Sequence, residues 1–316
     1  MRSFLFQDHK NMQNTNHLLL IKPAHFTFNK ETAGSNAFQN VLNEEEVAIK
    51  QKVLKEFENV ITTLQLNGME VTVIEDTPTP VKPDAIFPNN WGSYHADGTI
   101  VLYPMFASNR RLERRKDIID LLREKFQVKQ VIDLSAYEVE NKFLEGTGSI
   151  VFDHINKTAY ACLSPRTDKE LFIELSRQLG YKPVYFIAED EHGKQIYHTN
   201  VMMCIAEKFA VICLASITDA FEKKKVVQSL QQNGHEIIDI SFEQMNKFAG
   251  NMLEIKNRNG KHLLAMSKSA YDSLSVVQLN LIRKSCEPLS LPIQTIETIG
   301  GGSARCMMAE VFLTAK

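Results

Sequence analysis

The stretch NNWGSYHADGTIVLYP, residues 89–104, decides the fold, because later segments of the chain repeat its plan. It opens on polar residues, enters a short strand, turns at Asp97-Gly98 and continues into a second, apolar strand. An Asp-Gly pair between two apolar runs is a strong signal for a tight β-hairpin. The segment that follows, 109–126, carries apolar residues at the i, i+3 and i+4 spacing that predicts a helix.

Three further copies of this plan follow, and each has a polar opening, a hairpin and a helical segment. The copies begin with EGTGSIVFD (145–153), HTNVMMCI (198–205) and AGNMLEI (249–255). Their second strands are TAYACLS (158–164), FAVICLAS (209–216) and HLLAMS (262–267), and their helices are predicted at 168–180, 218–233 and 270–285. Further short strands, such as VKQVIDLS (128–135), stand between the units. The repeat is therefore β-β-α-β.

A fifth unit is divided between the two ends of the sequence. Its opening and one strand lie in GGGSARCMMAEVFLTAK (300–316), whereas HLLLIKPAHF (17–26), a helix over about 43–67 and MEVTVIED (69–76) supply the rest. A unit shared by both ends closes a ring and removes the open sheet edges of a linear array. We therefore predict an α/β fold, a five-bladed α/β propeller built from five ββαβ repeats around a pseudo-fivefold axis.

The opening residue of every unit is polar, although the strands beside it are apolar. These opening residues recur every 53 to 55 positions and are Asn90, Glu145, His198, Asn251 and Cys306. Because equivalent positions of a ring face the same axis, we expect them to meet around one central cavity. A cysteine, a histidine and a carboxylate that converge are typical of an activated thiolate. The sequence thus predicts Cys306 as nucleophile, His198 as acid/base and Glu145 beside His198.

Each of these residues also has a purely structural interpretation. A histidine in a strand often satisfies a local hydrogen bond, a glutamate before glycine often ends a turn, and an asparagine at a hairpin often bonds nearby backbone. The functional interpretation is favoured because all of the exceptions fall on one phase of one repeat. The run 300–302, three glycines, lacks the Gly-Lys-Ser/Thr ending of a phosphate loop. We interpret it as backbone that approaches a ligand closely.

Four motifs together resemble the guanidine-modifying, or pentein, superfamily. They are PDAIFPNNW (83–91), LEGTGS (144–149), HTN (198–200) and GGSARCM (301–307). That group includes arginine deiminase, agmatine deiminase, dimethylarginine dimethylaminohydrolase and the amidinotransferases, and the similarity covers residues 17–316 in the same order. The resemblance implies the five-bladed propeller and a catalytic set of Cys306, His198 and Glu145.

The same resemblance implies a set of substrate-binding residues. They are Asp84, Phe87, Asn90, Arg110, Arg166, Asn200 and Asn251. Arg110, whose alignment needs a one-residue insertion, and Arg166 would hold the substrate carboxylate. Asn90 and Asn200 are departures, since deiminases that act on a cationic guanidinium place an aspartate at each position. A guanidinium offers only donors, whereas a neutral ureido group also carries an acceptor oxygen and needs a donor.

The wording of the motifs looks most like the citrulline-hydrolysing branch of the superfamily, the citrulline utilisation hydrolases. The leading hypothesis is hydrolysis of L-citrulline to ornithine, ammonia and carbon dioxide without a metal or organic cofactor. One alternative is a deiminase or amidinotransferase that acts on arginine or a derivative. Another is a non-catalytic binding protein, because the translation initiation factor 6 group shares this fold and binds ribosomes.

Composition narrows the class of protein further. The chain has 316 residues and a formal net charge of -2, which argues against nucleic-acid or membrane-surface partners. The partner that the resemblance implies is a small amino-acid substrate. Its five cysteines form no CxxC pair, so we predict a cytoplasmic protein with free thiols. We expect a flexible tail, 1–16, before a single catalytic domain, 17–316. The sequence leaves the oligomeric state open, a homo-oligomer included.

Overall fold

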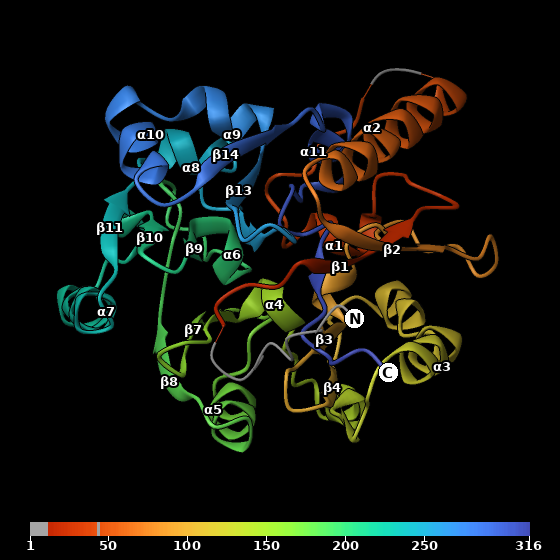
Figure 1. Cartoon of the computed structure of the whole chain (residues 1–316), viewed down its shortest axis with the longest axis horizontal. Coiled ribbons are helices and arrows are strands. Elements are labelled where there is room, and N and C mark those ends of the chain that lie inside the picture. Colours follow the sequence, from red (N-terminus) through yellow and green to blue (C-terminus); the bar gives the residue numbers. More distant parts are fainter. Residues whose placement is uncertain (1–11, 43–44) are drawn as a thin grey trace, which may run out of the picture.

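The computed structural model describes residues 12–42 and 45–316, and within these ranges the strands form five separate three-stranded sheets (Figure 1). Four of them follow one another along the chain: β3 (Gly92–Tyr94), β4 (Thr99–Leu102) and β5 (Gln130–Asp133); β6 (Val151–Asp153), β7 (Thr158–Cys162) and β8 (Lys182–Phe186); β9 (Met203–Ile205), β10 (Phe209–Ile212) and β11 (Glu236–Asp239); β12 (Leu253–Lys256), β13 (His262–Ser267) and β14 (Glu287–Leu291). In each, the first strand is antiparallel to the middle strand, which is parallel to the last.

The fifth sheet joins the two ends of the chain. It consists of β15 (Ala309–Glu310), β1 (His17–Lys22) and β2 (Glu70–Glu75), with β1 in the middle. Leu18 pairs with Glu310 in the antiparallel half and with Val71 in the parallel half. The sheet therefore repeats the strand order of the other four, and the prediction of a unit split between the ends is confirmed.

Neighbouring sheets contact one another mainly through their first strands. β15 lies against β3, β6 against β9, and β9 against β12. Figure 1 shows the sheets following one another around the centre of the molecule, with helices α2, α3, α5, α7 and α10 at its periphery. The first strands, and the turns that precede them, are thereby brought to the middle.

Helices connect the middle and last strands of each sheet, and short helices also precede first strands or lie between successive sheets. Their bounds are α1 (Lys30–Ala33), α2 (Glu46–Leu66), α3 (Lys116–Lys125), α4 (Gly146–Ser149), α5 (Lys169–Gln178), α6 (Thr199–Met202), α7 (Ala220–Gln232), α8 (Phe242–Asn246), α9 (Lys268–Ser273), α10 (Val276–Arg283) and α11 (Gln294–Gly300). The longest, α2, buries Phe57, Val60 and Leu64 on one face. Each such buried side chain contributes roughly 1.5–3 kcal/mol. None of the helices in the described part of the chain has the length and apolar character needed to cross a bilayer.

Two of the predicted helices differ from the structure. The predicted helix 109–126 begins as a 3-10 turn, η3 (Ser108–Glu113), and becomes α-helical only at Lys116, since Arg115 is extended. The predicted helix 270–285 is two helices, α9 and α10. Ser275 has extended backbone and caps α10 through a reciprocal pair of hydrogen bonds with Gln278, so the chain changes direction there. Of the predicted helix 43–67, residues 43–44 lie outside the described residues.

The opening residues were expected in strands, and this is wrong. Asn90 ends a 3-10 turn, η2 (Pro88–Asn90), whereas Glu145 and His198 precede the helical turns α4 and α6. Beside Glu145, the backbone of Gly146 is left-handed and packs too closely on its neighbours to continue as a strand. Gly146 has a φ of 48°, and a Cβ on it would lie 2.8 Å from the carbonyl oxygen of Asn90. The turns hold the opening side chains at the inner ends of the sheets.

The residues that precede β1 contact two of the sheets. Residues 1–11 of the expected tail lie outside the described residues. The buried side chain of Gln13 donates to the Phe152 carbonyl (2.9 Å) and accepts from the His154 amide (2.8 Å). Thr15 Oγ1 donates to the carbonyl of Val311 (2.9 Å). Residues 13–15 thus bond the second sheet and the chain just after β15.

Candidate active site

Glu145 and His198 form a buried hydrogen-bonded pair between two neighbouring units. His198 Nε2 lies 2.8 Å from Glu145 Oε2, and both side chains are buried. Arg166 Nη1 lies 3.5 Å from the same carboxylate oxygen. Burial opposes ionisation of Glu145, but Arg166, His198 and Arg110 outweigh it and lower the pKa of Glu145 to about 2. The carboxylate is therefore ionised at neutral pH.

The same surroundings keep His198 neutral. Burial lowers its pKa to about 4, although the hydrogen bond and charge of Glu145 act in the opposite direction. A neutral imidazole that donates from Nε2 to a carboxylate leaves Nδ1 as the acceptor. The pair therefore fixes one tautomer and leaves Nδ1 as the proton acceptor.

His198 Nδ1 lies beside Gly148, where a larger residue would not fit. A Cβ on Gly148 would lie 2.7 Å from His198 Nδ1 and closer still to Asn90 Nδ2. Asn90 is therefore beside His198, although the two belong to different units. Gly148 was not singled out in the sequence, where it reads as one glycine of the LEGTGS motif.

Cys306 lies in the turn between α11 and β15 and is 6% exposed. Asn251 Nδ2 and Asn200 Nδ2 lie 3.3 Å and 3.5 Å from its sulfur, and both are donors. Asn251 also holds this turn, because its Oδ1 accepts from the Arg305 amide at 3.1 Å. Two amide donors are thus directed at one sulfur, and Asn251 Oδ1 lies 3.6 Å from it. Asn200 follows His198 by two residues, so the same short turn carries the imidazole and a side chain that contacts the Cys306 sulfur.

Three polar atoms of this site are buried and have no hydrogen-bond partner among the described residues. They are Asp84 Oδ1, Asn90 Nδ2 and Asn200 Oδ1, and we name them the open atoms. A buried polar atom without a partner costs about 1–3 kcal/mol, so such atoms point to a ligand or solvent. The set consists of two acceptors and one donor. Burial raises the pKa of Asp84, with the Arg110 charge acting against it.

Arg110 is occupied by protein partners. Its Nε and Nη2 contact the two carboxylate oxygens of Glu113 at 2.9 and 2.8 Å, and its Nη1 donates to Asn90 Oδ1 at 2.8 Å. Nη2 also donates to the carbonyl of Phe87 at 3.1 Å. This arrangement braces the turn that carries Asn90 and leaves little capacity for the substrate carboxylate predicted for Arg110. The partner Glu113 was missed in the sequence, where 109–126 was predicted only as a helix.

Arg166 is held by a segment that the sequence analysis left unassigned, around α1. Arg166 Nη2 donates to the Thr32 carbonyl at 3.2 Å, and Nε donates to Ser35 Oγ at 3.1 Å. The same segment reaches Asp84, whose Oδ2 accepts from Asn29 Nδ2 at 2.7 Å. Residues 29–36 thus bind both the arginine and the aspartate expected to contact substrate. No periodicity marks this segment in the sequence.

Phe87 lies against the glycine run that precedes Cys306. A Cβ on Gly300 or on Gly302 would lie 2.7 or 2.9 Å from its ring. The ring also meets Phe26 edge-on, with centroids 6.4 Å apart. The glycines are therefore needed for the close approach of the loop to the site wall, and Gly301, with a φ of 60°, ends α11 in the left-handed region.

Most of the chain matches one known protein family. Residues 22–313 match the family described as N,N dimethylarginine dimethylhydrolase, eukaryotic. The chain belongs to this family. The family is part of the pentein guanidine-modifying superfamily of the sequence analysis, and its members are hydrolases that act on C–N bonds other than peptide bonds. Among curated proteins, none matches the chain in sequence.

Solved structures share the family's fold at low sequence identity. The arginine dihydrolase ArgZ of cyanobacteria, in its apo form, has 16% identity, covers 93% of this chain and superposes with a TM-score of 0.72, while this chain spans only 40% of it. Its N-terminal domain alone, a Cys-to-Ser mutant bound to substrate, is covered to 99%. A dimethylarginine dimethylaminohydrolase adduct with S-methyl-L-thiocitrulline has 16% identity and a TM-score of 0.64, with 95% of this chain and 100% of that chain covered. These likenesses show a mixed α/β fold of repeated small sheets.

Proposed function

We propose that the chain hydrolyses a C–N bond of a ureido group in a small amino acid, with L-citrulline as substrate, and that Cys306, His198 and Glu145 perform the reaction. The single observation that carries this substrate is the composition of the open atoms, two acceptors and one donor. A ureido group presents N–H donors on its nitrogens and an acceptor on its carbonyl oxygen. Asp84 Oδ1 and Asn200 Oδ1 match the N–H groups, and Asn90 Nδ2 matches the oxygen.

The first step forms a covalent intermediate. Neutral His198 takes the proton of the Cys306 thiol on Nδ1, and the thiolate attacks the ureido carbon. Charge develops on the ureido oxygen, where the Asn90 amide donates. His198 then returns the proton to the departing amine as the C–N bond breaks. Ammonia leaves, and the carbon stays bound to Cys306 Sγ as a thiocarbamate.

Water completes the reaction. His198 Nδ1 removes a proton from water as its oxygen attacks the thiocarbamate carbon, and the Cys306 thiol is restored when the C–S bond breaks. The released carbamate of ornithine loses carbon dioxide. Citrulline and one water thus give ornithine, ammonia and carbon dioxide, with all protons carried by His198. Glu145 holds the imidazole in the tautomer that this exchange needs and stabilises its transient positive charge.

The remaining predicted site residues have four different roles in this proposal. Asn251 and Asn200 stabilise the thiolate through their amide donors, and Asp84 binds the ureido N–H groups. Arg110 acts as a brace for Asn90. Arg166 and Phe87 form walls, and the segment 29–36 covers the site through its bonds to Arg166 and Asp84.

We also propose that the five sheets are the blades of one propeller and that residues 17–316 form a single catalytic domain. The contacts of β15 with β3, β6 with β9 and β9 with β12 support a closed succession. So does the meeting of opening residues from different units, since Asn251 contacts Cys306 and Glu145 contacts His198. Residues 13–15 pack on this domain.

A cationic guanidino substrate, arginine or a methylated arginine, is the second candidate. The observation that favours it is the balance of buried charge at the site, since the carboxylates outnumber the guanidinium groups. The carboxylates are Asp84, Glu113 and Glu145, and the guanidinium groups are those of Arg110 and Arg166. A cation beside Asp84 would lower its raised pKa and balance the surplus. The family's description and ArgZ's name agree with this class.

One assay separates the two substrates. We expect ammonia release from citrulline, little ammonia from arginine or agmatine, and little dimethylamine from dimethylarginine. Asn90→Asp places a carboxylate against the ureido oxygen, which costs about 1–3 kcal/mol and lowers kcat/KM on citrulline roughly five- to a hundred-fold. The same variant should gain activity on arginine, whereas Asn259→Asp, an exposed turn residue, should change neither value. If the wild type prefers arginine or dimethylarginine, the substrate is the cationic guanidino compound of the second candidate and not citrulline.

A further inference from the structure

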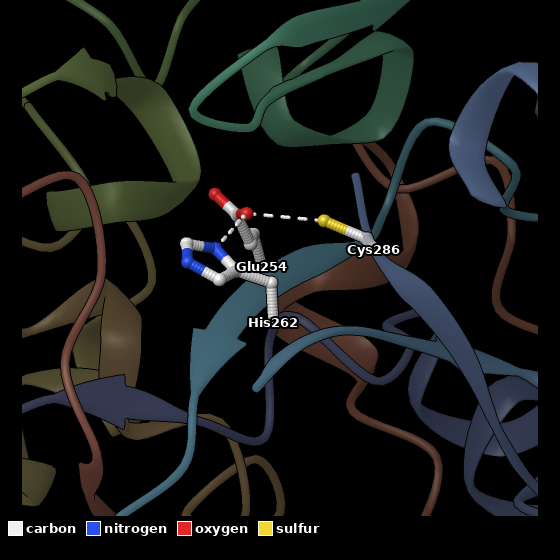
Figure 2. Close-up of side chains that lie close together, drawn as sticks. All are labelled: Glu254, His262 and Cys286. Atoms are coloured by element: carbon white, nitrogen blue, oxygen red, sulfur yellow. Dashed lines mark hydrogen bonds and ion pairs between the residues drawn. The ribbon is translucent and has the colours of Figure 1, made fainter. Parts of the chain in front are cut away.

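A second group of a glutamate, a histidine and a cysteine lies within the β12–β13–β14 sheet (Figure 2). His262 Nδ1 lies 2.7 Å from Glu254 Oε1, and Cys286 Sγ lies 3.0 Å from the same oxygen. The three ligand atoms all lie within 4.8 Å of one another, and this is the one such grouping of histidine, cysteine and carboxylate side chains in the described residues. We name it the sheet set.

The register of the sheet brings these residues together. Leu264 pairs with Glu254 on one side and with Pro288 on the other, so all three side chains share one face of the sheet. His262 and Cys286 each stand two positions before one of these partners and therefore lie on the same face. The two-residue alternation of β-strands thus places the imidazole, thiol and carboxylate at one end of that face.

The surroundings orient the carboxylate toward the other two groups. The second oxygen of Glu254, Oε2, accepts from the backbone amide of Glu207 at 2.7 Å, which leaves Oε1 for His262 and Cys286. A hydrogen bond of this kind to a ligating carboxylate is typical of metal sites. Glu254 and Cys286 are buried, whereas the His262 side chain is 22% exposed and gives the group access to solvent.

We propose that Glu254, His262 and Cys286 bind a divalent cation of the zinc class, with a water molecule as the fourth ligand. A mixed set of thiolate, imidazole and carboxylate suits Zn²⁺, which binds them at about 2.0–2.3 Å in tetrahedral geometry. Ligand atoms around such an ion are separated by about 3.3–3.8 Å. The two contacts of Glu254 Oε1 need to lengthen by less than about 1 Å to reach this geometry, and the separation of His262 Nδ1 and Cys286 Sγ, which is at most 4.8 Å, must close to the same range. His262 begins β13 and Cys286 precedes β14, so both stand at strand ends where small shifts are easy.

Binding replaces hydrogen bonds by coordination. The Cys286 thiol loses its proton to solvent and its sulfur bonds the cation. The proton on His262 Nδ1 leaves to solvent, so that the neutral imidazole carries its proton on Nε2 and bonds the cation through Nδ1. Glu254 Oε1 exchanges two hydrogen bonds for one metal bond. The cation then joins all three strands of one sheet. No residue of the sheet set belongs to the proposed catalytic set, so this site is independent of the substrate assignment.

The test uses full-length protein with Cys306→Ser, which removes the thiol of the proposed catalytic set. Co²⁺ is added to the metal-free protein, and the thiolate-to-cobalt charge-transfer absorption is recorded. We expect one equivalent of Co²⁺ to produce the band and Zn²⁺ to displace it. We expect Zn²⁺ to raise the Tm of the same protein by several degrees, since a ligand that binds only the folded state stabilises it.

Variants assign the band to the sheet set. Adding Cys286→Ala should abolish the band and the Zn²⁺-dependent rise in Tm, and adding His262→Gln should weaken Co²⁺ binding by at least about tenfold. The matched controls are Cys213→Ala, another buried cysteine, and His192→Gln, an exposed histidine, and both should leave the band unchanged. His262→Gln keeps the test valid should Cys286→Ala unfold. The proposal fails if the Cys306→Ser protein gives no band, or if the band survives both Cys286→Ala and His262→Gln. Glu254, His262 and Cys286 would then be a hydrogen-bonded group and not a metal site.

Discussion

The chain contains a glutamate, a histidine and a cysteine together in two places, and the order of contacts differs between them. In the central set, Glu145 bonds His198, while Cys306 receives amide donors from Asn200 and Asn251. In the sheet set, Cys286 itself contacts the carboxylate oxygen of Glu254. The composition of the two sets is the same, so composition alone does not decide the chemistry.

The neighbours of each sulfur account for the difference. Burial and the adjacent Glu254 charge raise the pKa of Cys286, which keeps it a thiol unless a cation replaces its proton. Cys306 has donors rather than a carboxylate beside it. The central set also draws on three units of the repeat, whereas the sheet set belongs to one sheet. In the central set the carboxylate bonds the histidine and not the thiol, which is the arrangement that the proposed nucleophile requires. In the sheet set the carboxylate bonds the thiol directly.

The largest expected effect follows from exchanging sulfur for oxygen in each set. Cys306→Ser should lower kcat by about three orders of magnitude or more, because an alcohol is a far weaker nucleophile than a thiolate. Cys286→Ser should leave kcat within about twofold. The measurement is ammonia release at saturating substrate, with circular dichroism to confirm that both variants fold. Comparable losses in the two variants would erase the distinction between the sets.

Replacing the carboxylate of each set should give the next largest difference in activity. Glu145→Gln should lower kcat/KM by about 10²-fold, because the imidazole loses its charged partner. His198 must be neutral to accept a proton, so wild-type kcat/KM should fall as the pH drops through about 4, its pKa in the folded protein. Since Glu145 raises this pKa, Glu145→Gln should move the acid limb to lower pH. Glu254→Gln should leave the profile unchanged, and a limb that stays in place in Glu145→Gln would contradict the pairing.

A methyl group beside His198 gives the smallest expected change in this series. Gly148→Ala places a Cβ 2.7 Å from His198 Nδ1, so the ring and Asn90 must shift. We expect a loss of about 1–3 kcal/mol in the free energy of unfolding and about tenfold in kcat/KM. Gly34→Ala, where a Cβ would meet no atom within 4 Å, should change neither quantity. Unaltered activity in Gly148→Ala would show that Nδ1 does not face the reaction.

The repeat made much of this architecture predictable. Turn signals such as Asp97-Gly98 and apolar runs gave the sheets, and counting from Asn90 to Cys306 selected the residues that meet in the centre. Local signals that were available were not all used. Ser275 and Gln278 have the spacing of a capping box, which announces the break between α9 and α10. The sheet set also follows from strand alternation once the register is known.

The rest of the site depends on contacts that no local pattern contains. Asn29 and Ser35 reach Asp84 and Arg166 from an irregular segment, through pairs separated by 55 and 131 residues. Charge patterning also misleads at Arg110, because a helix face of mixed charge and a buried ion pair with Glu113 look alike in sequence. Burial, which distinguishes them, is a property of the whole fold.

The sheet formed by β15, β1 and β2 has a consequence for how the protein is made. β1 is synthesised long before its antiparallel neighbour β15. Leu18 therefore cannot pair with Glu310 until nearly all of the chain between them has been made. The turn that carries Cys306 leads into β15, so its C-terminal side is fixed only when this pairing forms. A growing chain can therefore complete four sheets while the fifth still lacks its first strand, and closing so long a loop is slow. Cys306, the proposed nucleophile, is therefore the last member of the proposed site to be assembled, and a chain shortened from either end loses the same sheet.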